Sequence, residues 1–466
     1  MKKGLVCGIL LTATLVAQEP ERFRRLEQQL DQIREQLKIP GMSVAVLKDQ
    51  QVVWSKGFGY ADLAGRVPRT AGTPQPVASL TKTLAATLVM QLVEQGKLDL
   101  DEPVSKYSKD FSGDTVKIKH LLSHTSEGTP GENYSYNGNR YGYLTTILEQ
   151  KTGKSFRRLL RETFLDPLEM RDTVPGHDLE TDGDKWVADL GSDNLQRYQD
   201  VLKRMAKPCR LYGDELVETP YPPRGISAAA GLISTVFDLA KFDAAIDRHR
   251  FLKQETQDHA WTPFVSNSGR KLPHGLGWFS EEYMGQRLIW HYGNWPDQFS
   301  ATYVKVPGKQ MTFLLLASSG NASVPFYYTG GIETSPFACS FLQLFVFDGS
   351  AGCEAETQRT VSLFRAARRA HVRTAVHVDS ATLARYAGQY PVSPNRTFTV
   401  RAIGDGLEVD IPRGSWSKLY PESSTTFFLK TTDAEITFVE ANGTIRMDLD
   451  LPDRTIATRS SAAEKR

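Results

Sequence analysis

Apolar residues near the start of the chain recur at three- and four-residue spacing, at Phe23, Leu26, Leu30, Ile33 and Leu37. This period is typical of one face of a helix, and the Pro40-Gly41 pair predicts its end. The next stretch, MSVAVLKDQQVVWSKGFG, contains two runs rich in β-forming residues on either side of Asp49-Gln50. It predicts a β-hairpin.

Helical and extended patterns then alternate to about residue 350. They predict helices over residues 79–95, 141–152 and 235–247, and strands near residues 287–291, 300–306 and 311–318. Thr235 and Asp238 stand three residues apart at the start of one of these helices. This spacing predicts a capping box.

The pattern changes after residue 350. Residues 351–378 are rich in arginine and poor in large apolar residues after Phe364, which favours a linker. Beyond them, GLEVDI alternates apolar and acidic residues, and Asn442-Gly443 is a strong signal for a type I′ hairpin. Residues 379–460 are therefore predicted to form a small all-β domain.

The chain has 466 residues, of which 40% are hydrophobic, enough for a large core and more than one domain. It begins with two lysines and an apolar run, so we predict a signal peptide over residues 1–17 and a secreted or periplasmic protein. The apolar run is short for a bilayer span, and we expect no stable membrane span after leader removal. An uncleaved N-terminal anchor remains the alternative.

The charge balance bears on the choice of partners, and the cysteine content bears on disulfide bonds. The formal net charge is +2, and without Lys2 and Lys3 the 56 basic residues become 54, equal to the 54 acidic ones. This balance does not predict a nucleic-acid partner. Three cysteines follow the leader, and Cys339 with Cys353 is the nearest pair for a disulfide, which the sequence cannot establish.

One short string suggests chemistry. Ser-x-x-Lys occurs three times, but only Ser79 and Lys82 open a helical pattern. On a helix these positions share a face, with Cβ atoms about 5–6 Å apart. A serine needs a neighbour to take its proton, and burial would lower the pKa of a lysine toward neutrality. The alternative is a serine helix cap followed by a solvated lysine.

Longer strings carry a resemblance. They are VASLTKTLAATLVMQLVEQGKLDLDEPVSKY, IKHLLSHTS, FLDPLEMRDT, AAAGLISTVFDLAKF, HGLGW and WHYGNWPDQFS. In this order they resemble the serine β-lactamase and penicillin-binding-protein superfamily, most of all its class C-related branch, which includes esterases and D-amino-acid peptidases. The resemblance implies an α/β (α+β) fold over residues 18–350: an antiparallel sheet flanked by helices, plus a helical domain, with the active site between them. The C-terminal segment resembles a lipocalin-like domain.

The resemblance also implies roles for single residues. Ser79 matches the acylated nucleophile and Lys82 its lysine. Tyr136 matches the tyrosine of a Tyr-x-Asn element, with Gly138 in the place of the asparagine. Asn137 or Asn139 could substitute for it, and an alignment on Tyr134 stays open.

The third family element, a Lys-Thr-Gly-like strand, matches His291-Tyr292-Gly293. We expect His291 and Gly293 to bind substrate, and the backbone N–H groups of Ser79 and Asn294 to form an oxyanion hole. Histidine in place of lysine removes a fixed cation, because imidazole is mostly neutral at pH 7.

These expectations combine into a secreted serine hydrolase that acts through an acyl-enzyme on ester or peptide and amide bonds, including D-amino-acid or cell-wall-derived substrates. Its partner is a small-molecule or peptide substrate, it needs no cofactor, and oligomers are compatible with the sequence.

His120 and His124 have an i, i+4 spacing, but the motif is incomplete and no metal site is predicted. A true β-lactamase and a non-catalytic muropeptide- or partner-binding protein remain alternatives. The sequence does not decide whether Lys82 or Tyr136 is the principal base.

Overall fold

The computed structural model describes residues 6–222, 225–323, 331–349, 372–393, 396–404, 406–411, 415–431, 434–441, 443–450 and 455–458, with five single positions between 355 and 362. The chain forms two compact units. The larger unit contains residues 1–208 and 221–364, and the smaller contains residues 209–220 and 365–466.

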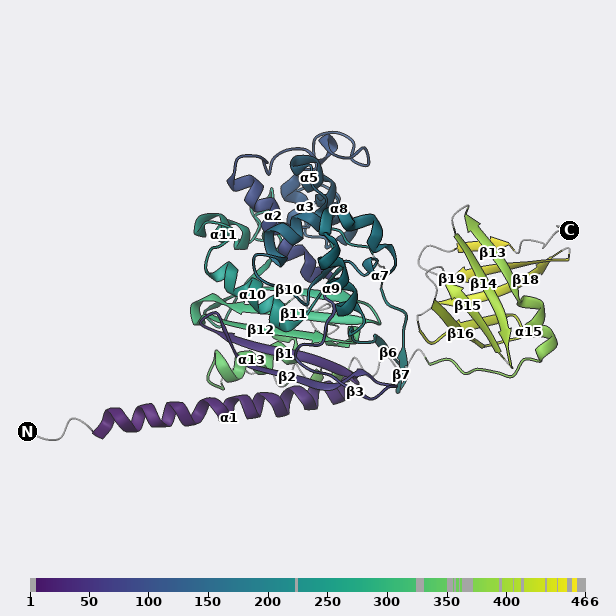
Figure 1. The fold of residues 1–466 in the computed structure, drawn as a ribbon, viewed down its shortest axis with the longest axis horizontal. Helices are drawn as coiled ribbons and strands as arrows, with labels where there is room; N and C mark the ends of the chain where they lie inside the picture. The colour runs from purple at the N-terminus through teal and green to yellow at the C-terminus, as the bar shows by residue number, and fades with distance from the viewer. Residues whose placement is uncertain are drawn as a thin grey trace, which may run out of the picture. The chain divides into compact units, whose positions relative to one another are not determined.

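A seven-stranded antiparallel sheet is the base of the larger unit (Figure 1). Its strand order is β3 (Val67–Pro68), β2 (Gln51–Asp62), β1 (Gly41–Lys48), β12 (Met311–Ala317), β11 (Phe299–Val306), β10 (Gln286–Trp295) and β9 (Phe279–Tyr283). β1 pairs with β12, so the predicted N-terminal hairpin is joined to strands from the end of the unit.

Two helices cover one face of this sheet, α1 (Val6–Gln36) and α13 (Pro336–Phe345) (Figure 1). The Phe23 ring of α1 stacks on Trp54 of β2 at 5.9 Å and packs against Phe345 of α13 at 4.8 Å. α1 extends further toward the N-terminus than the period predicted and contains Pro20. No helix in the described part of the chain combines the length and the apolar character needed to cross a membrane.

The opposite face carries the helical part of the unit (Figure 1). Its α-helices are α2 (Thr81–Glu94), α3 (Ile118–Leu122), α4 (Gly138–Gly142), α5 (Leu144–Thr152), α6 (Phe156–Leu160), α7 (Leu179–Asp182), α8 (Val187–Leu190), α9 (Ser192–Leu202), α10 (Val236–Asp247) and α11 (Gln254–Trp261). A three-stranded sheet of β4 (Gln75–Pro76), β8 (Leu232–Ser234) and β5 (Val174–Pro175) lies beside them.

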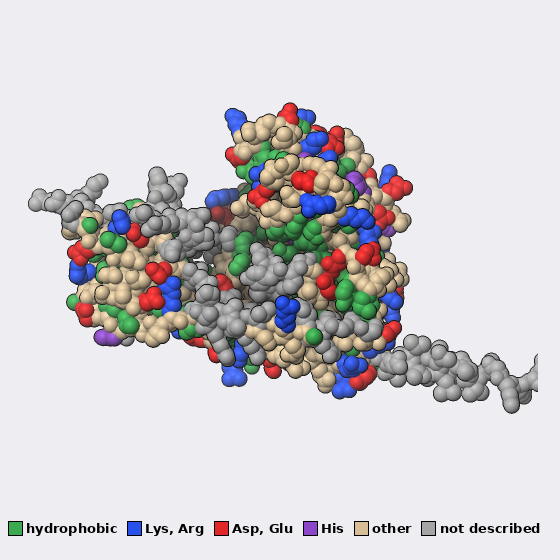
Figure 2. Space-filling model, turned by 180° about the vertical axis from the view of Figure 1, so that it is seen from behind, with side chains coloured by type: hydrophobic (Ala, Val, Ile, Leu, Met, Phe, Trp, Pro, Cys, Tyr) green, Lys and Arg blue, Asp and Glu red, His purple; other side chains and the backbone are tan. Residues whose placement is uncertain are grey.

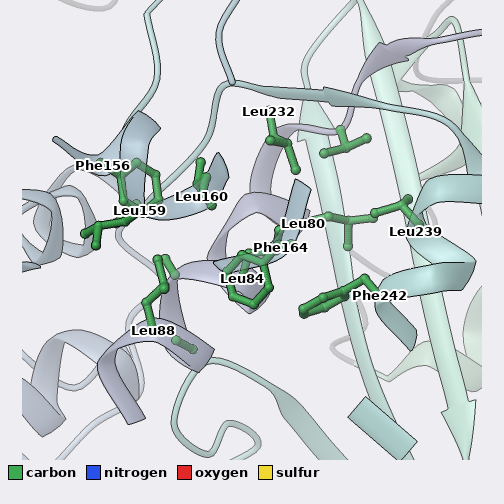
Figure 3. Packing of buried hydrophobic residues seen from close by; sticks show 14 of the residues in the cluster. Leu80, Leu84, Leu88, Phe156, Leu159, Leu160, Phe164, Leu232, Leu239 and Phe242 are labelled. Carbon is green, nitrogen blue, oxygen red and sulfur yellow. The ribbon is translucent and has the colours of Figure 1, made fainter. Parts of the chain in front are cut away.

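α2 runs through the centre of this layer. Its Leu84 and Leu88 are buried in a cluster that includes Phe164 and Phe242 (Figure 3). Figure 2 shows hydrophobic side chains gathered midway along one face of the larger unit, with charged side chains toward its outer edges. Because α2 is held by apolar contacts along its length, its first turn is a fixed platform.

Most predicted elements are confirmed, with corrections at helix starts. The helix predicted over residues 141–152 is divided into the end of α4 and α5, which begins at Leu144. Residues 78–80 form a 3₁₀ turn and α2 begins only at Thr81. The Thr235 side chain accepts from Asp238 N at 3.2 Å, as a cap should. The reciprocal bond of a capping box, from Thr235 N to the Asp238 side chain, is not the one this carboxylate makes. It accepts instead from Asp172 N at 2.8 Å. That bond ties α10 to the loop before β5.

The smaller unit confirms the predicted all-β architecture. Eight antiparallel strands follow in sequence order: β13 (Gly388–Ser393), β14 (Arg396–Ile403), β15 (Gly406–Ile411), β16 (Ser415–Pro421), β17 (Thr426–Leu429), β18 (Glu435–Ala441), β19 (Thr444–Asp450) and β20 (Thr455–Thr458). β13 also contacts β20, which makes the sheet a nearly closed barrel. The helix α15 (Ser380–Tyr386) and the side chains of Tyr390, Phe398 and Phe438 contribute to its apolar core.

Two other predictions for this part of the chain fall partly outside the described residues. β18 and β19 pair up to Ala441 and Thr444, and Gly443 has φ 75°, while Asn442 lies outside the described residues. Most of the predicted linker lies outside them as well. Its last residues, 372–378, contact the barrel, because Val376 N donates to Pro421 O at 2.8 Å.

The sequence did not predict that a hairpin from the middle of the chain would join this unit. β6 (Cys209–Tyr212) and β7 (Glu215–Glu218) form it. The Tyr212 ring stacks on Phe428 at 6.0 Å, and Lys430 forms an ion pair with Glu215 at 2.7 Å. The smaller unit is therefore built from two separate stretches of sequence.

Candidate active site

Ser79 and Lys82 lie where the 3₁₀ turn meets α2. The Lys82 ammonium nitrogen, Nζ, donates to Ser79 Oγ at 2.9 Å and to the carbonyl oxygen of Ala229 at 2.8 Å. Only 1% of Lys82 is exposed, and no side chain caps α2. The alternative of a capping serine beside a solvated lysine is therefore wrong. Ala78, just before the serine, has φ 48°, a strained conformation for a residue with a side chain.

Burial changes the chemistry of this lysine. Removal of the amine from water lowers the pKa of Lys82 to about 7, because the charged form loses its hydration. A substantial fraction of the amine is then neutral at pH 7. A neutral amine beside a hydroxyl can accept its proton, which is what activation of a serine requires.

Two tyrosine rings lie next to the same amine. Lys82 Nζ is 5.1 Å from the centre of the Tyr136 ring and 5.3 Å from that of Tyr141. The Tyr141 hydroxyl donates to the Lys82 carbonyl oxygen at 3.1 Å. Tyr134 packs instead near His124 and His274. This placement favours the alignment on Tyr136 over the one on Tyr134.

The three residues after Tyr136 differ in whether they can take the place of the family's asparagine. A Cβ added to Gly138 would lie 3.8 Å from Lys82 Nζ, so this is the position from which a side chain would reach the amine. Asn137 is occupied elsewhere: its side chain accepts from Arg140 N at 2.9 Å and donates to Glu127 at 2.7 Å. Asn139 is exposed and lines the cleft, so of these two asparagines it is the one whose amide a substrate can reach.

The strand β10 forms another side of the site, but its three predicted residues do not all face the same way. Asn294 lines the cleft. His291 is completely buried, with Nδ1 2.7 Å from the carbonyl oxygen of Tyr292. Burial holds the pKa of His291 well below its usual range, so the ring is neutral. The structure thus places His291 behind the cleft wall, and its predicted substrate contact stays a prediction.

Gly293 allows a close approach, although its nearest neighbour is the chain itself. A Cβ built on Gly293 would lie 2.1 Å from the Val77 carbonyl oxygen and 3.2 Å from the Ala78 Cβ. The strand is therefore pressed backbone to backbone against the turn that carries Ser79. This contact brings Asn294 and Ser79 to the same cleft.

The cleft itself has a volume of about 510 Å³ and is open to solvent. Ser79, Lys82, Asn139, Asn294 and Trp295 are among its lining residues, and Lys82 is the one charged side chain that lines it within the described part of the chain. Trp278, by contrast, is buried in the core. The site thus offers a serine, an amine that is partly neutral at pH 7, and amide groups to a substrate.

Sequence reasoning missed the carbonyl of Ala229, which holds Lys82, because a backbone group leaves no signal in the side-chain pattern. It also missed the crowding of three buried histidines, His124, His274 and His291, near the amine. Within the described ranges, no group of three or more His, Cys, Asp and Glu residues is arranged to hold a metal ion.

Residues 23–327 match the protein-family model described as Beta-lactamase. The chain belongs to the beta-lactamase family. This confirms the resemblance drawn from the motifs, and the family's fold is one of serine hydrolases. Residues 372–459 match a second model, described as Domain of unknown function (DUF3471).

Named relatives agree with this assignment. Penicillin-binding protein 4* of Bacillus subtilis (strain 168) is 22% identical over 435 residues, which cover 85% of this chain and 89% of that protein. Protein flp of Staphylococcus aureus (strain MW2) is 25% identical over 328 residues, covering 62% of this chain and 61% of that protein.

Solved structures share the fold. The octameric penicillin-binding protein homologue from Pyrococcus abyssi has a TM-score of 0.58 at 21% identity, over 93% of this chain and 99% of that one. The D-amino acid amidase from Ochrobactrum anthropi SV3 complexed with L-phenylalanine amide has a TM-score of 0.56 at 21% identity, over 69% of this chain and 98% of that one.

Proposed function

We propose that this chain is an exported serine hydrolase that forms an acyl-enzyme on Ser79 and hydrolyses ester or peptide and amide bonds. The observation that carries the proposal is the 2.9 Å contact between Ser79 Oγ and the buried amine of Lys82 at the edge of an open cleft. The family assignment supports the reaction class.

The geometry supports a sequence of proton transfers. Neutral Lys82 takes the proton of Ser79 Oγ as the oxygen attacks the substrate carbonyl, forming the C–O bond of a tetrahedral intermediate. The N–H groups of Ser79 and Asn294 stabilise the oxyanion. The proton then passes to the leaving alcohol or amine as its bond to carbon breaks, with Tyr136 beside Lys82 as the second candidate carrier. Water hydrolyses the acyl-enzyme by the reverse transfers.

The cleft favours a substrate without a charge at its acyl group. His291 is neutral and buried, so it supplies no fixed cation for a carboxylate, and Gly138 supplies no amide for an acylamino group. Asn139 and Trp295 remain as a polar and an aromatic contact. We therefore rank esters and amides, including those of D-amino acids or cell-wall fragments, above β-lactams.

Export is part of the proposal. The N-terminal pattern of two lysines and an apolar run supports it. Cys339 is disulfide-bonded, which fits an oxidising compartment, while Cys353, the nearest cysteine along the chain, lies outside the described residues. N-terminal sequencing of the protein recovered from the medium or periplasm tests both the cleavage and the destination.

A fluorophosphonate probe followed by peptide mapping tests the nucleophile. We expect one adduct, on Ser79, and none in the Ser79→Ala variant. Ser415, in another Ser-x-x-Lys string, provides the matched control: Ser415→Ala should label like the wild type. Labelling that persists in Ser79→Ala would overturn the assignment.

A substrate panel then separates the candidate functions. Nitrophenyl esters, D-amino-acid amides and a chromogenic cephalosporin are compared on the wild type and on Ser79→Ala. Turnover of esters or amides supports the proposal, and cephalosporin hydrolysis at ordinary enzyme rates would make the protein a true β-lactamase. Saturable muropeptide binding with no Ser79 adduct would make it a non-catalytic receptor.

A further inference from the structure

His124 holds the backbone on both sides of Tyr136. Its carbonyl oxygen accepts from Ser135 N at 2.8 Å, and its Nδ1 accepts from Asn137 N at 3.2 Å. The two donors are the residues immediately before and after the tyrosine. One residue therefore fixes the main chain that carries the Tyr136 side chain.

The imidazole also contacts the tyrosine directly. The His124 ring stacks on Tyr136 with centroids 4.2 Å apart and planes 26° apart, and it stacks on Tyr141 at 5.2 Å. These are the two rings that lie about the Lys82 amine. A flat aromatic partner restricts how the tyrosine ring can tilt, so the contact sets the direction of its hydroxyl as well as the position of its backbone.

The state of the imidazole fits this role. Since Nδ1 accepts a hydrogen bond, the neutral ring carries its proton on Nε2. His124 is 2% exposed, and its burial holds its pKa well below the usual range, so the accepting form is the one present at neutral pH. The backbone at His124 has φ 55°, in the left-handed region that few residues with a side chain adopt.

We propose that His124 is a positioning residue that sets the placement of Tyr136 beside Lys82. This inference rests on the proposed role of Tyr136 in proton transfer. His124 is not expected to touch the substrate, so its loss should act on the rate of the chemical step and leave substrate binding nearly unchanged.

The chain contains a matched control four residues earlier. His120 is also buried, at 5% exposed, and its Nδ1 also accepts a backbone hydrogen bond, from Lys117 N at 3.1 Å. Its ring packs near Phe264 at 6.2 Å. His120→Ala removes the same kind of side chain and the same kind of bond from the same stretch, without a bond to the Tyr136 loop.

The experiment measures kcat, KM and melting temperature on a nitrophenyl ester for His124→Ala, His124→Asn and His120→Ala in the full chain. We expect His124→Ala to lower kcat by about 100-fold with little change in KM, since a misplacement of about 1 Å costs that much. Asparagine tolerates the left-handed backbone and places an oxygen near the position of Nδ1, so His124→Asn should recover about tenfold of that loss. His120→Ala should keep kcat within about threefold of the wild type.

Equal losses of kcat in His124→Ala and His120→Ala, alongside equal losses of melting temperature, would show a purely structural role and overturn the inference. A kcat in His124→Asn no higher than in His124→Ala would do the same. Should His124→Ala fail to fold, a wild-type kcat in His124→Phe, which keeps a ring but no acceptor, would show that the Nδ1 bond to Asn137 N does not position Tyr136.

A double-mutant cycle with Tyr136→Phe separates this inference from the function on which it rests. We expect Tyr136→Phe to lower kcat, and His124→Ala to add little in that background, because both act on the same hydroxyl. Full additivity would overturn the positioning role alone. A wild-type kcat in Tyr136→Phe would overturn the role of Tyr136 and the inference together, while Ser79 labelling would still report on the nucleophile.

Discussion

Gly293 of β10 and Val77 of the turn before Ser79 meet backbone to backbone, and a Cβ on Gly293 would lie 2.1 Å from the Val77 carbonyl oxygen. No rotamer of a larger residue relieves a clash at Cβ, so one of the two backbones must move. We expect Gly293→Ala to separate Asn294 from Ser79. Loss of a donor to the oxyanion costs about 10²–10³ in kcat, and we predict a loss of this size, measured on a nitrophenyl ester.

The control for this variant is another glycine next to the same sheet. A Cβ on Gly308 would meet only the Gln286 side chain, at 3.2 Å, and that side chain can move. Gly308→Ala should therefore keep wild-type kcat. Near-normal activity in Gly293→Ala would show that the contact with Val77 does not position the oxyanion donors.

The pKa of Lys82 predicts a pH dependence. The amine must be neutral to accept the Ser79 proton, and its burial lowers its pKa to about 7. We therefore expect kcat/KM to rise with pH up to about 7 and then level off. The nearby histidines do not account for this rise of kcat/KM with pH, because burial holds the pKa of His274 at about 3 and that of His124 well below its usual range. A kcat/KM that keeps rising up to about pH 10 would mean that Lys82 remains charged at pH 7 in the free enzyme.

The same shift in the pKa of Lys82, which helps catalysis, is predicted to lower the stability of the fold at neutral pH. The pKa of Lys82 is 10.5 in an exposed setting and about 7 in the fold, so the unfolded chain binds the proton more tightly. The free energy of unfolding should rise with pH between these values, and the cost of burying the amine is largest at pH 7 and below. Lys82→Met should raise the melting temperature at pH 7, with a smaller gain at pH 10. A gain that does not change with pH would contradict the shift.

Some of the site could be predicted from the sequence because its residues are close along the chain. Ser79 and Lys82 are one helical turn apart, so local geometry nearly determines their contact. The orientation of His291 could not be predicted, since strand alternation gives two faces and only the packing of β10 on its neighbours decides which face is buried. The roles of His124 and Ala229 depend on contacts between distant segments. The same limit applies to the β6 and β7 hairpin, whose partner residues lie more than 150 positions away.

Gly138 is the position where a side chain would restore the family's asparagine. Its added Cβ would lie 3.8 Å from Lys82 Nζ, an ordinary contact, so Gly138→Asn should fold. We expect the new amide to reach into the cleft and bind an acylamino group, lowering KM for an N-acyl-D-amino-acid amide relative to a simple ester. Asn139→Ala in the same background reports whether the native amide already serves that purpose. An unchanged ratio of the two KM values would contradict the assignment of Tyr136, Gly138 and Asn139 to this element.

Tyr212 joins the β6 and β7 hairpin to the barrel, and its removal should loosen the smaller unit. Its ring stacks on Phe428, and its hydroxyl accepts from Arg373 N at 2.8 Å. An aromatic pair of this kind contributes about 0.5–1.5 kcal/mol beyond its buried area. We expect Tyr212→Ala to speed amide exchange in residues 209–218, Tyr212→Phe to have a smaller effect, and the exposed control Ile403→Ala to have almost none. Unchanged exchange in Tyr212→Ala would show that the ion pair of Lys430 and Glu215 is enough to hold the hairpin, and that the aromatic contact is incidental.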